Sequence, residues 1–123
     1  MILVALVFCA VLTALALFQG ALIAGAPLGR LAWGGQDVVL PRNKRVGSGI
    51  SIVLYAGFAF VALQKARSVD AEPAFISIAM WVIAGYLVLG IAMNALSRSR
   101  PERFTMVPVT AALAVLALVL AVS

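Results

Sequence analysis

The stretch GAPLGRLAWGGQDVVLPRNKR, residues 25–45, divides this chain of 123 residues into two apolar parts. It is the one long segment that is neither a continuous apolar run nor a short turn, and the apolar runs on both sides are long enough to cross a bilayer. It holds four of the nine basic residues and four of the ten glycines. We call it loop one, and we expect any specific activity of the chain to involve it.

The composition of the whole chain is typical of a membrane protein. Hydrophobic residues make up 65% of the chain and charged residues 11%, whereas soluble domains contain roughly 45–50% and about 25%. The apolar runs predict helices long enough for a hydrocarbon core near 30 Å, at residues 2–24, 46–64, 74–96 and 105–122. The expected fold class is an all-α integral membrane protein, a four-transmembrane-helix bundle in a single domain over 1–123.

Breakers and capping residues suggest where these spans begin and end. Gly25 and Pro27 end the first span, Pro73 suits the start of the third, and Thr105 is a plausible N-cap of the fourth, with Pro108 in its first turn. The first apolar run has no basic residue before it and is longer than the roughly 7–15 apolar residues of a signal peptide. We therefore interpret it as a retained span.

Basic residues are distributed unevenly between the two sides of the predicted bundle. Loop one and loop three (residues 97–104) together carry seven of them, namely Arg30, Arg42, Lys44, Arg45, Arg98, Arg100 and Arg103. Loop two (residues 65–73) carries Lys65 and Arg67 with the acids Asp70 and Glu72. The positive-inside rule then predicts cytoplasmic loops one and three, and both termini on the periplasmic side.

Polar side chains of the four spans gather in the half of the membrane beside loops one and three, as Gln19, Ser48, Ser51, Asn94 and Thr110. On the third span, helical spacing aligns a stripe of Tyr86, Gly90, Asn94 and Arg98. This cluster is either a pocket for a lipid head group or a small polar molecule, or a set of hydrogen bonds between helices, each worth roughly 0.6–2 kcal/mol. Both interpretations stay open at this stage.

Two further features bear on packing. A stripe of small residues on the first span, Cys9, Thr13, Ala16, Gly20 and Ala24, would let another helix approach closely. Loop one contains too many apolar side chains to stay in water, and its glycines supply turns. We expect it to fold over the cytoplasmic end of the bundle, with Trp33 near Gln19 or Asn94, although a membrane-interface anchor is the commoner role of such a tryptophan. As an alternative to a role in topology, Glu102 could pair with a loop-one arginine and join the two loops.

Catalytic and metal chemistry find little support in the residues. The chain has no histidine and one cysteine, so a zinc site of histidine and cysteine is excluded and no cofactor is expected. Asp37 and Glu102 are the only acids on the predicted cytoplasmic side, which leaves a paired-carboxylate mechanism open but weak. The residues favour a non-enzymatic protein, and the question of an enzymatic activity stays open.

Candidate binding residues are the polar, aromatic and basic side chains that converge on the cytoplasmic half of the bundle: Gln19, Trp33, Arg42, Arg45, Ser51, Tyr55, Tyr86, Asn94, Arg98, Glu102 and Arg103. The expected partners are membrane lipids, through anionic head groups on the cytoplasmic side. A homo-oligomer or a larger membrane complex stays open. Nucleic acid is not expected, because the basic residues are split among short loops.

The motifs GAPLGRLAWGG, Leu40-Pro41 with Arg45, and the segment from Asn94 to Arg103 give the chain a family resemblance. It resembles an uncharacterised family of small bacterial four-span membrane proteins over both predicted cytoplasmic loops and the adjoining ends of the spans. The resemblance implies a bacterial inner-membrane setting. It implies no activity, and no catalytic residue is carried over from it.

Three functions remain in order of preference. The first is a non-enzymatic membrane protein that acts through contact with lipids or a partner protein. The second is a carrier or binding protein for a small molecule or lipid head group, using the polar cluster. The third is a membrane enzyme that acts on a lipid. The first predicts an exposed face of small residues, whereas the others predict a cavity lined by Gln19, Tyr55, Tyr86 and Asn94.

Overall fold

The computed structural model describes residues 1–68 and 72–123, and in these residues the chain forms four long helices and no strand. The helices are α1 (Ile2–Ile23), α2 (Arg42–Arg67), α3 (Ala74–Ala95) and α4 (Arg100–Val122). Each is long and apolar enough to cross a membrane. The expected all-α, four-span bundle is therefore confirmed. Asp70, one of the two acids counted in loop two, lies outside the described residues.

Two helices begin earlier than the apolar runs indicated. Pro41 is the N-cap residue of α2, so the last four residues of loop one form the first turn of that helix. The N-cap of α4 is Ser99, whose side chain accepts a hydrogen bond from the Glu102 N–H at 3.4 Å. The prediction of Thr105 as N-cap was wrong, because Ser99 caps the helix six residues earlier and Pro101 lies in its first turn. Pro108 consequently lies inside α4.

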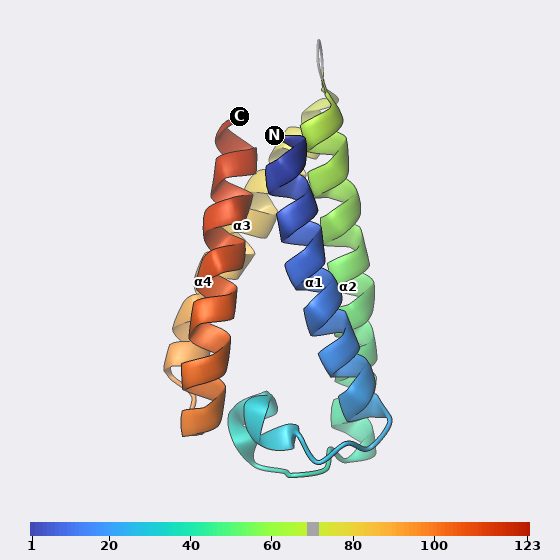
Figure 1. Cartoon of the computed structure of the whole chain (residues 1–123), viewed down its shortest axis with the longest axis vertical. Helices are drawn as coiled ribbons and strands as arrows, with labels where there is room; N and C mark the ends of the chain where they lie inside the picture. Colours follow the sequence, from blue (N-terminus) through green and yellow to red (C-terminus); the bar gives the residue numbers. More distant parts are fainter. Residues whose placement is uncertain (69–71) are drawn as a thin grey trace.

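The four helices pack as two hairpins that meet along only part of their length. α1 packs mainly on α2, and α3 packs mainly on α4, while contacts between the hairpins are fewer. The main core, which includes Phe8, Leu12, Met80, Leu113 and Leu120, lies toward the loop-two end of the bundle. Figure 1 shows the hairpins close together near the two termini and farther apart at the opposite end, which we call the loop-one end.

Loop one crosses this wider end and has its own local structure (Figure 1). It contains two short 3₁₀ helices, η1 (Gly29–Leu31) and η2 (Trp33–Gly35). The Gly29 N–H donates to the Val38 carbonyl at 2.8 Å, which closes the loop on itself. A small second core packs loop one against the end of α1, through Leu22, Ala32 and Leu40 with Phe18. The expectation of a structured loop one is confirmed.

Arg45 fastens the junction between α1 and α2. The end of α1 is closed by Gly25, whose φ of 94° is the left-handed conformation that glycine adopts readily. Arg45 Nε donates to the Leu40 carbonyl at 2.8 Å, and its Nη1 donates to the Ile23 carbonyl at 3.4 Å. The guanidinium therefore satisfies a carbonyl at the C-terminal end of α1, where a positive charge also suits the helix dipole.

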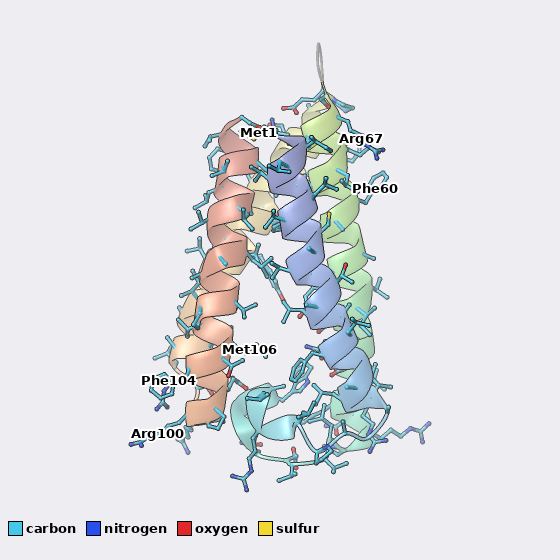
Figure 2. The ribbon with its side chains drawn as sticks, in the orientation of Figure 1. Met1, Phe60, Arg67, Arg100, Phe104 and Met106 are labelled. Atoms are coloured by element: carbon cyan, nitrogen blue, oxygen red, sulfur yellow. The ribbon has the colours of Figure 1, made fainter. Side chains whose placement is uncertain are left out.

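The loop-two end is held by an ion pair. Lys65 Nζ lies 2.6 Å from Glu72 Oε1 and donates to the Ser123 carbonyl at 3.0 Å. The Lys65 side chain is buried, so these contacts provide the partners that a buried ammonium needs. Figure 2 places Arg67 at this end of the bundle and Arg100 at the loop-one end.

Candidate functional site

The first turn of α4 holds loop one in place. Glu102 Oε2 accepts the Gly34 N–H at 3.0 Å, and Ser99 Oγ donates to the Arg30 carbonyl at 2.6 Å. Ser99 and Glu102 have the spacing of a capping box, in which the glutamate normally turns back to the N-cap amide. Here its carboxylate bonds to loop one instead. The predicted pairing of Glu102 with a loop-one arginine was wrong, because a backbone amide takes that position.

Trp33 ties loop one to the other hairpin. Its Nε1 donates to Ser48 Oγ at 3.2 Å, and its ring lies so close to Gly47 that a β-carbon there would come within 2.7 Å of the ring. The backbone of Trp33 has a φ of 53°, in the left-handed region that residues with a side chain rarely adopt. Loop one therefore bridges α2 and α4 at the end where the hairpins diverge.

Beneath loop one lies a cavity of about 150 Å³, which we call the inner cavity. Most of its polar lining comes from the four helices and Trp33, namely Gln19, Trp33, Tyr55, Asn94, Glu102 and Thr110. Asn94 Nδ2 donates to Thr110 Oγ1 at 2.9 Å, which links α3 to α4. Gln19 Oε1 is buried and has no hydrogen-bond partner in residues 1–68 and 72–123. Trp33, which was expected near Gln19 or Asn94, lines this cavity together with both residues.

A larger opening of about 650 Å³ adjoins the inner cavity, and we call it the lateral cleft. Its wall is mostly α3, with Tyr55 of α2 facing it and Trp33, Gly34 and Glu102 at its loop-one end. The stripe predicted on the third span contributes Tyr86, Gly90 and Asn94 to this wall, while exposed Arg98 lies outside it. The cleft shares Trp33, Tyr55, Asn94, Glu102 and Thr110 with the inner cavity, so its polar lining continues into that cavity.

An apolar groove of about 490 Å³ lies on the other side, between α1 and α4. Its lining includes Val7, Phe18 and Met106. Figure 2 shows Met106 on the side of α4 that faces the interior, and Phe104 and Arg100 on its outer side. Leu15 borders this groove, the inner cavity and the lateral cleft. The three spaces therefore follow one another across the loop-one half of the bundle.

Six of the eleven candidate binding residues lie at these spaces, and the other five lie elsewhere. The six line the inner cavity or the lateral cleft: Gln19, Trp33, Tyr55, Tyr86, Asn94 and Glu102. The rest make other contacts or face outward. Arg45 binds the carbonyls at the end of α1, Arg103 Nη1 donates to the Ser97 carbonyl at 2.6 Å, and Ser51 donates to the Gly47 carbonyl of its own helix. Arg42 and Arg98 are exposed.

Several lining residues were absent from the candidate list. Thr110 had been recognised as polar and in the correct half of its span, and it lines both spaces. Gly34, Met93 and Ser97 also line the lateral cleft. The capping signal at the start of α4 would have drawn attention to this segment, in which Ser97 precedes the helix and Glu102 lies in its first turn. No sequence signal identifies Met93, because its side chain is one of many apolar groups on α3.

The acidic side chains and the cysteine near the site are separated from one another. The described residues contain no group of three histidine, cysteine or acidic side chains that could hold a metal ion. Asp37 pairs with Lys44, and Glu102 bonds to Gly34, so each loop acid has a separate partner. Cys9 lies beside Ala59 of α2, with Sγ 3.9 Å from its carbonyl oxygen. The lining of the inner cavity and the lateral cleft offers hydrogen-bond acceptors, aromatic rings and apolar side chains.

No protein-family model matches this chain, and no curated protein or solved structure is similar to it.

Proposed function

We propose that this protein is a non-enzymatic membrane binding protein that holds one amphipathic molecule in the loop-one half of its bundle. The apolar part of the molecule lies in the lateral cleft, and its polar part lies in the inner cavity beneath loop one. The observation that carries the proposal is that Gln19, Tyr55, Tyr86 and Asn94 border these spaces. Side chains that served only to join helices would fill one another's space.

The size and lining of the cleft support this proposal. A volume of about 650 Å³ falls in the range of roughly 300–1,000 Å³ that is usual for small-molecule sites. Leu87, Leu89 and Met93 line its α3 wall together with Tyr86, whereas Glu102 and Asn94 lie at the end that adjoins the inner cavity. A molecule with an apolar tail and a polar head matches this division.

Hydrogen bonding between helices accounts for only part of the polar cluster. It explains Asn94 with Thr110 and the interaction of Gln19 with Tyr55, but within the described residues it leaves Gln19 Oε1 buried without a partner. Partner binding through the small-residue stripe is also less favoured. Cys9, Thr13 and Ala16 of that stripe border a shallow groove whose other wall is α2 of the same chain.

The test is to obstruct the cleft and to measure lipid retention. Met93 is 64% exposed at the cleft, so Met93→Trp should narrow the cleft without disturbing the core. Val82→Trp is the matched control, because Val82 is 65% exposed on the same helix and lies outside the cleft lining. Native mass spectrometry should show a retained lipid or other amphiphile on the parent and on Val82→Trp, and much less on Met93→Trp. Equal retention by all three proteins would overturn the proposal.

The setting that we propose is a bacterial inner membrane, with loops one and three in the cytoplasm and both termini in the periplasm. The support is the asymmetry of the basic residues between the two ends of the bundle. Exposed Arg30, Arg42, Arg98 and Arg100 at the loop-one end would then face anionic lipid head groups.

A further inference from the structure

The inner cavity presents hydrogen-bond acceptors whose capacity the described residues do not fully use. Gln19 is 9% exposed, and its Oε1 has no hydrogen-bond partner among these residues. Glu102 is 6% exposed and receives the Gly34 N–H on Oε2. No other hydrogen bond to its carboxylate is made within residues 1–68 and 72–123. A buried acceptor without a donor destabilises a fold, so Gln19 Oε1, at the same cavity as a carboxylate with spare accepting capacity, favours a ligand that brings donors.

The charge of Glu102 is also without a cationic partner in the described chain, where the ion pairs are Asp37–Lys44 and Lys65–Glu72. Arg103 lies one residue away but donates to the Ser97 carbonyl. The first turn of α4 favours an anion through the helix dipole, but a dipole supplies no hydrogen bond to the second carboxylate oxygen. A cationic donor would complement this position.

Aromatic side chains complete the environment. Trp33 and Tyr55 border the inner cavity, and Tyr55 and Tyr86 border the adjoining cleft. Aromatic faces attract ammonium groups within about 6 Å. A cavity of about 150 Å³ has the volume of roughly five water molecules, which is enough for an ammonium group but not for a large head group.

We propose that the molecule held in the lateral cleft carries an ammonium group, which enters the inner cavity and donates to Glu102 and Gln19. This inference rests on the proposed function and adds the chemistry of the head group. The ammonium belongs either to an aminophospholipid of the membrane or to a free amphipathic amine, because both present the same cation beside an apolar tail.

The test compares a cationic amphiphile with a neutral one. Dodecylamine and dodecanol are titrated against the purified full-length protein in detergent, in a Trp81→Phe background, so that emission reports on Trp33. Dodecylamine should give a saturable change at a concentration at least about tenfold below that of dodecanol, as expected for one charge-assisted hydrogen bond in a buried site. Equal affinities for the two amphiphiles would overturn the inference.

Three variants identify the groups responsible. Glu102→Gln keeps an oxygen that can accept the Gly34 N–H, and Gln19→Leu removes an acceptor that has no donor in the part of the chain that the structure describes, so both should fold. Each should weaken dodecylamine binding about tenfold and weaken dodecanol binding less, because the hydroxyl of dodecanol forms no charge-assisted hydrogen bond. Asp37→Asn removes a loop-one charge outside the cavity and should change neither. Unchanged dodecylamine binding by Glu102→Gln would overturn the inference.

Lipid retention separates the two sources of the cation. The protein is exposed to equimolar phosphatidylethanolamine and phosphatidylglycerol, and bound lipid is measured by native mass spectrometry. Retention of phosphatidylethanolamine identifies a membrane aminophospholipid, whereas dodecylamine binding without lipid preference identifies a free amine. Preference for phosphatidylglycerol would overturn the inference, because the basic rim would then select the head group. Equal binding of dodecylamine and dodecanol refutes this inference alone, while the absence of any amphiphile binding in the cleft refutes the proposed function.

Discussion

Trp33 is the side chain whose replacement should most clearly release loop one. A fully buried tryptophan removes about 150–250 Å² from water, and Trp33 is 43% exposed, so its burial contributes roughly 2–3 kcal/mol. Trp33→Ala also removes the hydrogen bond to buried Ser48, worth about 1 kcal/mol. We expect loop one to open at least about a hundredfold more often, since each 1.4 kcal/mol is a factor of ten.

Tryptic cleavage after Arg30, which is exposed in loop one, measures this opening when reclosing is fast relative to cleavage. Trp33→Phe keeps most of the ring and loses the N–H, so its cleavage should rise only about fivefold. Trp33→Gly should be cleaved more slowly than Trp33→Ala, because glycine relieves a left-handed backbone worth about 1 kcal/mol. Trp81→Ala in α3 is the control and should match the parent.

Two results would refute this reasoning. If Trp33→Ala is cleaved at the rate of the parent, loop one is not held by that side chain. If Trp33→Gly is cleaved faster than Trp33→Ala, the left-handed backbone at this position does not oppose folding. The first result removes the role of Trp33 in closing the inner cavity, and the second removes only the conformational argument.

Two further predictions concern packing and orientation. Gly29→Ala should lower the melting temperature in detergent, because its β-carbon would overlap a backbone oxygen of loop one. Gly57→Ala, with open space around it, should be neutral or stabilising by up to about 1 kcal/mol. Equal melting temperatures of the two variants would contradict the packing of loop one. In a Cys9→Ser background in intact cells, Gln36→Cys should resist a membrane-impermeant thiol reagent and Ser68→Cys should react, and the reverse pattern would contradict a cytoplasmic loop one.

The sequence allowed the number of helices and some of their ends to be predicted, because each helix that crosses the hydrocarbon core needs an apolar run of sufficient length. The first and third spans were expected at 2–24 and 74–96, and they are Ile2–Ile23 and Ala74–Ala95. The starts of α2 and α4 were missed, because these helices extend beyond their apolar runs into basic segments, which in α4 are capped by Ser99. Such ends depend on local capping, and the spacing of Ser99 and Glu102 was the available signal.

The polar half of the site was also predictable in part. Polarity at equivalent depths of four spans located the cluster, but the rotation of each helix decides which members face inward. Gln19 and Asn94 line the inner cavity, whereas Ser51 bonds to its own helix. Arg45 was selected for its charge, yet its geometry closes the end of α1. Packing of the two hairpins sets these differences, and the pattern of one span carries no information about it.

Trp33 and Glu102 each have two roles, because both border the inner cavity and both fasten loop one. A change at either residue therefore alters the closure of loop one and the surroundings of a ligand together, and the two effects are not expected to be additive. Gln19 is different, because its Oε1 bonds to nothing in the described chain. Weaker amine binding by Gln19→Leu, with tryptic cleavage after Arg30 unchanged, would therefore assign the effect to the cavity and not to the closure of loop one.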